Sequence, residues 1–201
     1  MPSTDTRHAT SLPARYDSVA IGLHWIIALA FLSMLAIGFV MNSLPPADAW
    51  KFPLFQFHKS LGFTILGGVC LRLLWRLTHT PPALPTEMPT WERWAAEATH
   101  WVLYAILFAM PLSGWIIVSH SAFNFPTLYF GLFEIPHLSG VDFGFSKQQI
   151  EGAASLFHEL LAFSACGLIA LHAGAALRHH FALKDTVLRR MLPQFGKGTT
   201  Q

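Results

Sequence analysis

The sequence predicts an all-α integral membrane protein, a four-helix bundle that forms a single domain over residues 1–201. Of the 201 residues, 53% are hydrophobic and only 12% are charged, which is about half the charged share of soluble domains. Four apolar stretches are long enough to cross the hydrocarbon core of a bilayer as helices. Aromatic residues make up 13% of the chain and include seven Trp, as expected for side chains that line both membrane interfaces.

The first two spans are separated by a proline-containing break. The first covers residues 18–41, a stretch without any charged side chain. A Pro–Pro pair follows it, and proline lacks the backbone donor that a continuing helix needs. The second span covers 57–77 and carries Arg72 and Arg76 in its last turns. Each stretch is long enough to reach across the bilayer core as a helix.

The last two spans are separated by a long loop. The third span, 98–119, follows a proline-rich connector and contains Pro111, which is expected to kink the helix. The outer loop over 120–150 is too rich in Gly and Pro for a helix, and it is apolar enough to lie on the membrane surface. The fourth span covers 152–178 and leads into a basic tail. Neither an internal repeat nor a second domain is indicated.

The basic residues predict the orientation of the bundle. Cytoplasmic loops carry an excess of Lys and Arg. If both termini are cytoplasmic, ten basic residues face that side and three face the other, so we expect this orientation. The ten are Arg7, Arg15, Arg72, Arg76, Arg93, Arg178, Lys184, Arg189, Arg190 and Lys197, and the three are Lys51, Lys59 and Lys147.

The net charge and the cysteines indicate little about function. A net charge of +2 gives no sign of a nucleic-acid partner. Cys70 and Cys166 both lie in the middle of apolar runs, and we interpret them as small buried apolar side chains. A disulfide or a metal ligand is the less favoured interpretation.

Histidine is the unusual component of the sequence, since 11 His stand against 13 Lys and Arg together. Four of them, His24, His58, His158 and His172, lie within apolar spans. A polar ring in hydrocarbon is costly without a partner, so each of the four is a functional candidate. For any one taken alone, a hydrogen bond to a backbone carbonyl or to water in a pocket explains the ring about as well.

The spacing of these residues groups them into two pairs. His158 and His172 are 14 residues apart, about 3.9 helical turns, so both rings face the same way about 21 Å apart along the axis. Because successive helices alternate in direction, His24 falls at the cytoplasmic depth of His172. His58 likewise falls at the outer depth of His158.

Two facing imidazoles on two helices suit a low-spin b-type haem, whose iron takes a neutral nitrogen on each side. Such ligation favours electron transfer over oxygen binding. A zinc site needs three or four ligands at one depth, so it fits two separate pairs poorly. A proton relay of histidines is the other alternative. Two stacked haems fit the number, the depths and the spacing best.

Two further residues are candidates for contact with a haem propionate or a quinone. Arg72 lies 14 residues after His58, on the same helical face but at the cytoplasmic level; a basic residue that only sets the topology is the alternative. His100 lies near the cytoplasmic end of the third span. The other histidines are expected at the membrane interface, for His120, or in solvent, for His8, His79, His137, His179 and His180.

Small residues near the candidate ligands leave room for a porphyrin edge. These residues are Gly22, Gly62, Gly167 and Gly174. Ordinary close packing of membrane helices recruits the same residue types and is the simpler explanation for any one of them.

Longer stretches resemble the bacterial cytochrome b561 proteins, which are similar to the b-type subunits of nickel-iron hydrogenases. The stretches are RYDSVAIGLHW, FHKSLGFTILGGVCLRLLWR, HWVLYAILFAMPLSGW and FHELLAFSACGLIALHAGAALRHHFALKDTVLRRMLP, within Arg15 to Pro193. The resemblance implies four helices in the bacterial inner membrane, two b haems and electron exchange with a quinone such as ubiquinone. It places the axial ligands on His24, His58, His158 and His172.

The expected function is electron transfer across the membrane, between a donor or acceptor on the periplasmic side and a membrane quinone. A periplasmic cytochrome or a small lipid-binding protein is the expected kind of partner. One branch of the family is similar to superoxide oxidases, so a superoxide:ubiquinone oxidoreductase is the alternative, and a haem-free proton-handling bundle is a remote one. A cationic outer surface favours capture of superoxide, but here three lysines face four acids, Asp48, Glu134, Asp142 and Glu151.

Overall fold

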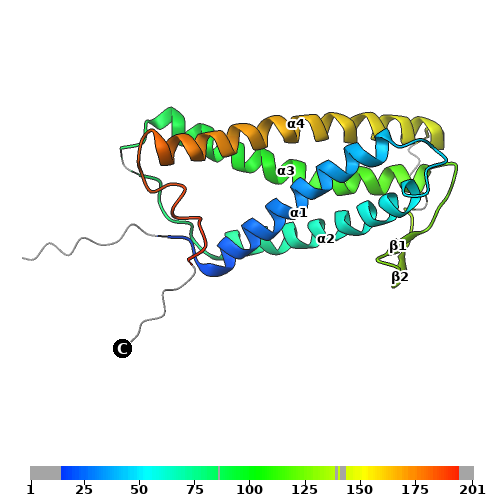
Figure 1. Ribbon diagram of the computed structural model, residues 1–201, viewed down its shortest axis with the longest axis horizontal. Helices are drawn as coiled ribbons and strands as arrows, with labels where there is room; N and C mark the ends of the chain where they lie inside the picture. Colours follow the sequence, from blue (N-terminus) through cyan, green and yellow to red (C-terminus); the bar gives the residue numbers. More distant parts are fainter. Residues whose placement is uncertain (1–14, 86, 139, 141–143, 195–201) are drawn as a thin grey trace, which may run out of the picture.

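Four long helices form the molecule in the computed structural model, which describes residues 15–85, 87–138, 140 and 144–194 (Figure 1). The helices are α1 (Ser18–Ser43), α2 (Lys51–Thr78), α3 (Thr90–His120) and α4 (Lys147–Phe181). All four are long and apolar enough to cross a membrane. The predicted four-helix membrane fold is confirmed.

Helices α2, α3 and α4 begin earlier than the apolar runs that define their predicted spans, whereas α1 begins at 18 as predicted. Lys51, Thr90 and Lys147 start α2, α3 and α4, whereas the apolar runs start at 57, 98 and 152. A capping box formed by Ser146 and Gln149 fixes the start of α4. The added turns of α3 and α4 are rich in polar residues, so hydropathy alone starts these two helices too far inward, whereas α2 adds the segment KFPLFQ, which contains Pro53.

The two ends of the bundle differ. At the end that we call the terminal end, the first and last described residues meet (Figure 1). There the Arg15 guanidinium donates to the Leu192 carbonyl at 2.5 Å, and the Trp25 indole donates to the Met191 carbonyl at 2.8 Å. At the opposite end, which we call the loop end, the connections 44–50 and 121–146 join the helices.

A short β-hairpin lies in the connection between α3 and α4. Its strands are β1 (Thr127–Tyr129) and β2 (Phe133–Ile135), paired antiparallel with Tyr129 opposite Phe133. Figure 1 shows the hairpin beside α2, folded back from the loop end. The predicted loop over 120–150 therefore contains two strands and the first turn of α4. Strands of three residues are too short for an alternating pattern to reveal them.

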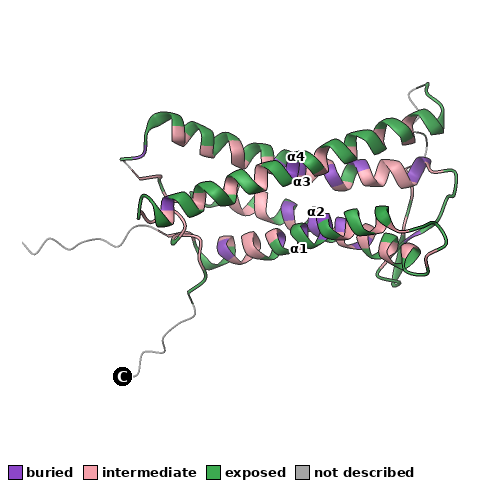
Figure 2. Cartoon of the chain, turned by 45° about the horizontal axis from the view of Figure 1, so that its top comes forward, coloured by how far each residue is buried: buried purple, intermediate pink, exposed green. Residues whose placement is uncertain are grey.

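The apolar core occupies the middle of the bundle, where buried residues of the four helices gather (Figure 2). It includes Phe31 of α1, Val69 of α2, Met110 of α3 and Ala165 of α4. Ala165 is fully buried and lies midway between His158 and His172 in the sequence. Large apolar side chains on the outer faces of the helices stay exposed, as expected where lipid covers them.

The interpretation of the cysteines as buried side chains is wrong. Cys70 and Cys166 are both exposed on the outside of the bundle, and neither forms a disulfide. Lipid is as apolar as a protein core, so an apolar run in a membrane helix does not distinguish lipid-facing from buried positions.

Candidate functional site

The four histidines of the apolar spans lie in two facing pairs. His24 of α1 faces His172 of α4 towards the terminal end, with ring centroids 6.2 Å apart and planes at 65°. His58 of α2 faces His158 of α4 towards the loop end, with centroids 6.3 Å apart and planes at 60°. The structure thus brings together the same pairs that the helix depths predict.

The spacing of both pairs fits a metal ion held between two imidazoles. Two metal–nitrogen bonds of about 2 Å, plus about 1 Å from each nitrogen to its ring centroid, separate the centroids by about 6 Å. The facing nitrogens are then about 4 Å apart at closest, beyond hydrogen-bond range. The paired rings are therefore too far apart to pass a proton directly, and the spacing suits the axial ligands of a haem.

The helices that carry the pairs leave space between them. Close backbone packing joins α3 to α4, α1 to α2 and α2 to α3, and among the described helices no comparable packing joins α4 to α1 or α2. Each histidine pair nevertheless links α4 to one of those two helices. A flat macrocycle between the rings accounts for this separation, whereas a cluster of metal ligands does not. Residues 15–194, as far as they are described, hold no group of three or more His, Cys, Asp or Glu side chains suited to a metal ion.

A serine on α3 orients the ring of His158. The Ser113 hydroxyl is buried and donates to the Met110 carbonyl at 2.8 Å. Its oxygen therefore accepts from Nδ1–H of His158, at 2.9 Å. With the proton held on Nδ1, Nε2 is the unprotonated nitrogen, which is the form that a metal ligand needs.

Two glycines pack against the rings of the loop-end pair. A Cβ atom on Gly38 of α1 would lie 3.3 Å from Cε1 of His58, and one on Gly114 of α3 would lie 3.4 Å from Cε1 of His158. Each ring therefore occupies space that a side chain would otherwise fill. Nδ1 of His58 is buried without a hydrogen-bond partner among the described residues. Neither glycine nor Ser113 stands out in the sequence, because their contacts cross from one helix to another.

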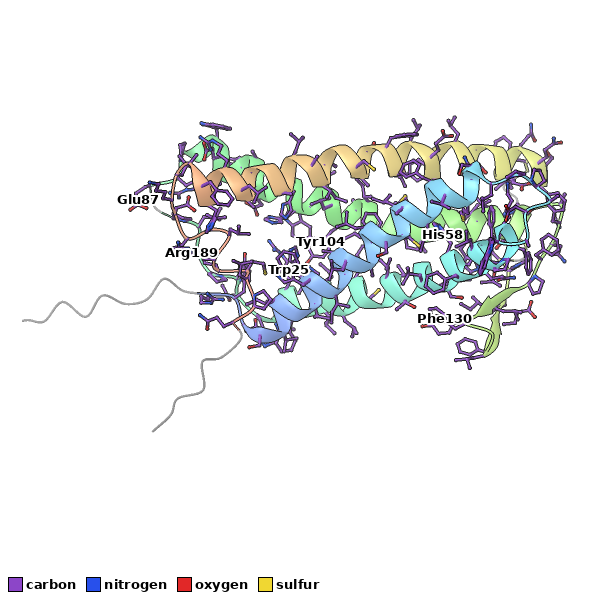
Figure 3. The ribbon with its side chains drawn as sticks, viewed as in Figure 1. Trp25, His58, Glu87, Tyr104, Phe130 and Arg189 are labelled. Atoms are coloured by element: carbon purple, nitrogen blue, oxygen red, sulfur yellow. The ribbon has the colours of Figure 1, made fainter. Side chains whose placement is uncertain are left out.

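Arginine, tyrosine and a fifth histidine surround the terminal-end pair. The His100 ring lies 5.3 Å from that of His172. Arg72 donates through Nε to the Tyr104 hydroxyl at 3.1 Å. Figure 3 shows Trp25 and Tyr104 in the half of the bundle opposite His58. Arg72 and His100, both predicted from the sequence, thus lie in the terminal-end half.

A cavity of about 450 Å³ opens beside Arg72 at the terminal end. Arg15, Arg72 and Arg76 contribute positive charge to it, and Asp17 contributes the one carboxylate among its described lining residues. Trp75 and Tyr104 add aromatic surface. The cavity therefore suits a group that carries negatively charged or carbonyl oxygens on an apolar body.

The other histidines differ in part from the prediction. His179 was expected in solvent but is buried, with Nδ1 2.5 Å from Asp185 and Nε2 3.7 Å from Glu92. His120, expected at the interface, is also buried, and its Nδ1 donates to the Ile116 carbonyl. His79 is exposed and stacks on Trp75. His137 and His180 are half-buried, and His8 lies outside the described residues.

The glycines that the sequence suggested near a porphyrin edge divide into two kinds. A Cβ atom on Gly62 would lie 3.0 Å from Met34 Cε, so this glycine permits close packing of α1 on α2. Gly22, Gly167 and Gly174 have open space where a side chain would be.

Comparison with known proteins gives consistent matches over nearly the whole chain. The family profile described as prokaryotic cytochrome b561 matches residues 15–194. Cytochrome b561 homolog 2 of Escherichia coli (strain K12) is 38% identical over 184 residues, 91% of this chain and 94% of the relative. The probable superoxide oxidase CybB of Yersinia pestis is 33% identical over 185 residues, covering 90% and 97%. Cytochrome b561 homolog 1 of Escherichia coli (strain K12) is 28% identical over 180 residues, covering 90% and 98%.

The predicted family is thereby confirmed. Four helices able to span a membrane and a family match over residues 15–194 agree with a multi-pass membrane protein. The chain belongs to the prokaryotic cytochrome b561 family, and it is a membrane electron-transfer protein of a family that binds haem b.

Proposed function

We propose that the chain holds two b haems and transfers electrons across the bacterial inner membrane, as part of a respiratory chain. His24 and His172 are the axial ligands of a terminal-end haem, and His58 and His158 are those of a loop-end haem. The observation that carries this proposal is the nearly equal spacing of the two pairs, 6.2 Å and 6.3 Å between ring centroids. When bound, a bis-imidazole haem supplies reversible one-electron exchange without an open coordination position.

The residues of the chain set where each haem is held and how its iron is ligated. α4 contributes one ligand to each site, so its rigidity fixes the separation of the two centres. Ser113 keeps the proton of His158 on Nδ1, and Gly38 leaves room for the ring of His58. Ala165 and the apolar core between the pairs exclude water from the space between the two centres.

The terminal end faces the cytoplasm in this proposal. The excess of Lys and Arg at that end supports this orientation, although Arg7 and Lys197, two of the ten basic residues that predicted it, lie outside the described residues. The outer donor or acceptor then meets the loop-end haem.

A quinone exchanges electrons at the terminal end. The cavity beside Arg72 offers guanidinium and phenol donors for a quinone carbonyl, and Trp75 offers a flat apolar surface for its ring. A propionate of the terminal-end haem is the other group that suits Arg72. His100 lies against His172 and is a second donor for either group.

A redox titration followed by the visible spectrum tests the proposal. Two haems in different surroundings are expected to give a b-type α band upon reduction and two one-electron steps. A single step that accounts for one haem per chain would contradict the two-haem proposal. The absence of any α band would support the haem-free, proton-handling alternative instead.

Replacement of Arg72 tests its role. Arg72→Leu is expected to shift the potential of the terminal-end haem or to slow quinone reduction, because a cation near that site is lost. Arg93→Leu is the matched control, since Arg93 donates to the Met88 and Pro85 carbonyls and does not line the cavity. If Arg72→Leu changed neither property, Arg72 would be a residue that only sets the topology.

Direct oxidation of superoxide is the second candidate function, because one relative is named a probable superoxide oxidase. The loop end has no excess of positive charge for the anion, since among the described residues Lys51, Lys59 and Lys147 stand against Asp48, Glu134 and Glu151. Lys51 donates to the Leu44 carbonyl and Lys59 to the Pro126 carbonyl; of the acids named above, Asp142 lies outside the described residues. This arrangement favours a protein partner over superoxide. Rapid mixing with superoxide decides between them, since haem reduction no faster than spontaneous dismutation would exclude the oxidase.

A further inference from the structure

The β-hairpin is attached to α2 along one edge. The edge of β1 that does not pair with β2 faces α2. Backbone groups of residues 126, 128 and 130 on this edge form hydrogen bonds with side chains of α2. The Pro126 carbonyl accepts from Gln56 Nε2 and Lys59 Nζ, both at 2.9 Å. The Ser60 hydroxyl accepts from the Phe130 amide at 2.9 Å, and its proton is shared between the Leu128 carbonyl at 3.0 Å and the Gln56 carbonyl of α2 at 2.9 Å. Side chains of α2 therefore satisfy a strand edge that would otherwise stay open.

These contacts continue far along α2. Thr64 lies 3.1 Å from the Tyr129 hydroxyl, and it lies about 20 Å along the axis from Lys51, the first residue of α2. His58 lies between these two residues in the sequence. The hairpin thus reaches a depth along the bundle at least as great as that of a haem ligand, on the outside of α2. At such a depth, irregular backbone is tolerated only where protein satisfies its polar groups.

Most of the remaining hairpin surface is apolar and exposed, apart from Glu134 of β2, which is exposed as well and directly follows the tip. Leu132 is 77% exposed and Phe133 57%, and Phe125 and Phe130 are exposed as well. Between the turn and α2 lies a groove of about 310 Å³, lined by Gln56, Phe57, Ser60, Leu128, Phe130 and Gly131. Water would be an unfavourable environment for so much apolar surface.

The conformation of the hairpin turn also indicates an apolar environment. Phe130 and Gly131 have φ values of 49° and 75°, and consecutive positive φ values favour Asn or Gly at both positions. A bulky aromatic side chain in this conformation is strained by about 1–3 kcal/mol. Its ring packs against Phe57, with centroids 5.9 Å apart. Burial of the Phe130 ring in an apolar environment would offset this strain, which would explain why an aromatic residue occupies the position.

We propose that the hairpin inserts its tip, Phe130–Phe133, into the lipid leaflet at the loop end. The partner is the acyl region of the bilayer, because the apolar surface of the hairpin continues the lipid-facing surface of α2. Phe52 and Phe57 of α2 are exposed, and they contact Phe125 and Phe130 respectively. The hairpin then covers Gln56, Lys59, Ser60 and Thr64, which would otherwise face lipid. This inference rests on the membrane fold and does not depend on the haem proposal.

Spin labels on single cysteines test the insertion in phosphatidylcholine vesicles that contain the full chain. Leu132→Cys is made in a Cys70→Ala/Cys166→Ala background, and the exposure of Leu132 lets the label sit there without disturbing the packing. Ala47→Cys in the same background is the water reference, since Ala47 lies exposed in the loop-end connection. Native Cys166, kept alone in Cys70→Ala, is the lipid reference, because it is exposed and lies about 100° round α4 from the buried Ala165.

The expected result is that molecular oxygen relaxes the label at 132 as it relaxes that at Cys166, whereas a water-soluble nickel chelate does not. Relaxation of the label at 132 by the chelate to the extent seen at 47 would overturn the proposal. Spin–spin broadening at 132 that disappears upon dilution with unlabelled protein would show a second copy there and would overturn it as well. Phe130→Asn, which relieves the strain of the turn but removes the ring, is expected to make the label at 132 more accessible to the chelate.

Discussion

The two histidine pairs have nearly the same spacing, but the chain supports them in different ways. Arginines, Tyr104 and His100 surround the terminal-end pair, whereas Ser113 and two glycines contact the loop-end pair. Nearby cations favour the reduced form of a haem, and a hydrogen bond accepted from Nδ1–H makes an imidazole more basic and favours the oxidised form. Both effects give the terminal-end haem the higher potential. Electrons are then expected to run from the loop end to the terminal end.

Loss of a histidine ligand is expected to have the largest effect, because it removes one of the two sites. His158→Ala is expected to remove the loop-end haem and His172→Ala the terminal-end haem, because each pair shares only α4 with the other. The haem content, measured from the reduced absorbance per chain, should fall by about half in each variant. The remaining haem should show the higher potential in His158→Ala and the lower one in His172→Ala. Retention of both haems in His158→Ala would contradict the pairing.

A methyl group at Gly38 affects the loop-end pair alone. Gly38→Ala places Cβ 3.3 Å from His58 Cε1, and overpacking of this kind costs about 1–3 kcal/mol. The loop-end haem should therefore be lost at lower concentrations of a competing apo-haem protein, while the terminal-end haem is retained. Gly67→Ala is the matched control, because Gly67 lies on the face of α2 opposite His58 and open space surrounds it. Equal haem loss from both variants would show a general effect on helix packing.

Removal of the Ser113 hydroxyl makes a smaller change at the same pair. A hydrogen bond contributes about 0.5–1.5 kcal/mol, so Ser113→Ala should raise the potential of the loop-end haem by about 20–60 mV. The terminal-end potential should stay constant in the same titration. Ser33→Ala is the control, since its hydroxyl bonds only within α1, to the Leu29 carbonyl. A shift of both potentials, or of neither, would remove Ser113 from the set of residues that tune the loop-end haem.

The fold and the histidine pairs were predictable for a physical reason. Bilayer thickness forces long uncharged stretches, and a polar ring inside such a stretch stands out in the sequence. Helix direction alternates, so depth alone matched His24 with His172 and His58 with His158.

The remaining contacts were not predictable because they depend on which faces of the helices meet. Ser113 and Gly38 look like many other small residues of membrane helices until a neighbouring ring is placed against them. The burial of His179 depends on Glu92, on a different helix. The exposure of Cys70 and Cys166 depends on where lipid lies. The position of the hairpin depends on polar side chains along one face of α2. From the sequence alone, these side chains indicate only a face in contact with water.

The two ends of the bundle also differ in their helix caps, one of which is titratable and the other not. Asp17 accepts from the Ala20 amide at 2.9 Å and caps α1 at the terminal end, and Ser146 caps α4 at the loop end. The hydrogen bond from the Ala20 amide holds the pKa of Asp17 below its usual 3.8; burial opposes this effect, and the Trp75 indole adds to it. A lowered pKa gives a stabilisation that is present above the unfolded value and is lost only as the pH falls through the lower folded value.

Asp17→Ala and Ser146→Ala should therefore both lower the thermal unfolding temperature in detergent, each by the equivalent of about 1 kcal/mol or less. The exposed position of Asp17 keeps its share small. Between about pH 5 and pH 8 both penalties should be constant, because the Asp17 carboxylate stays ionised throughout this range. Circular dichroism at several pH values measures them. A penalty for Asp17→Ala that already shrinks at about pH 5, with that of Ser146→Ala unchanged, would show that the Ala20 amide does not hold the carboxylate as the structure indicates.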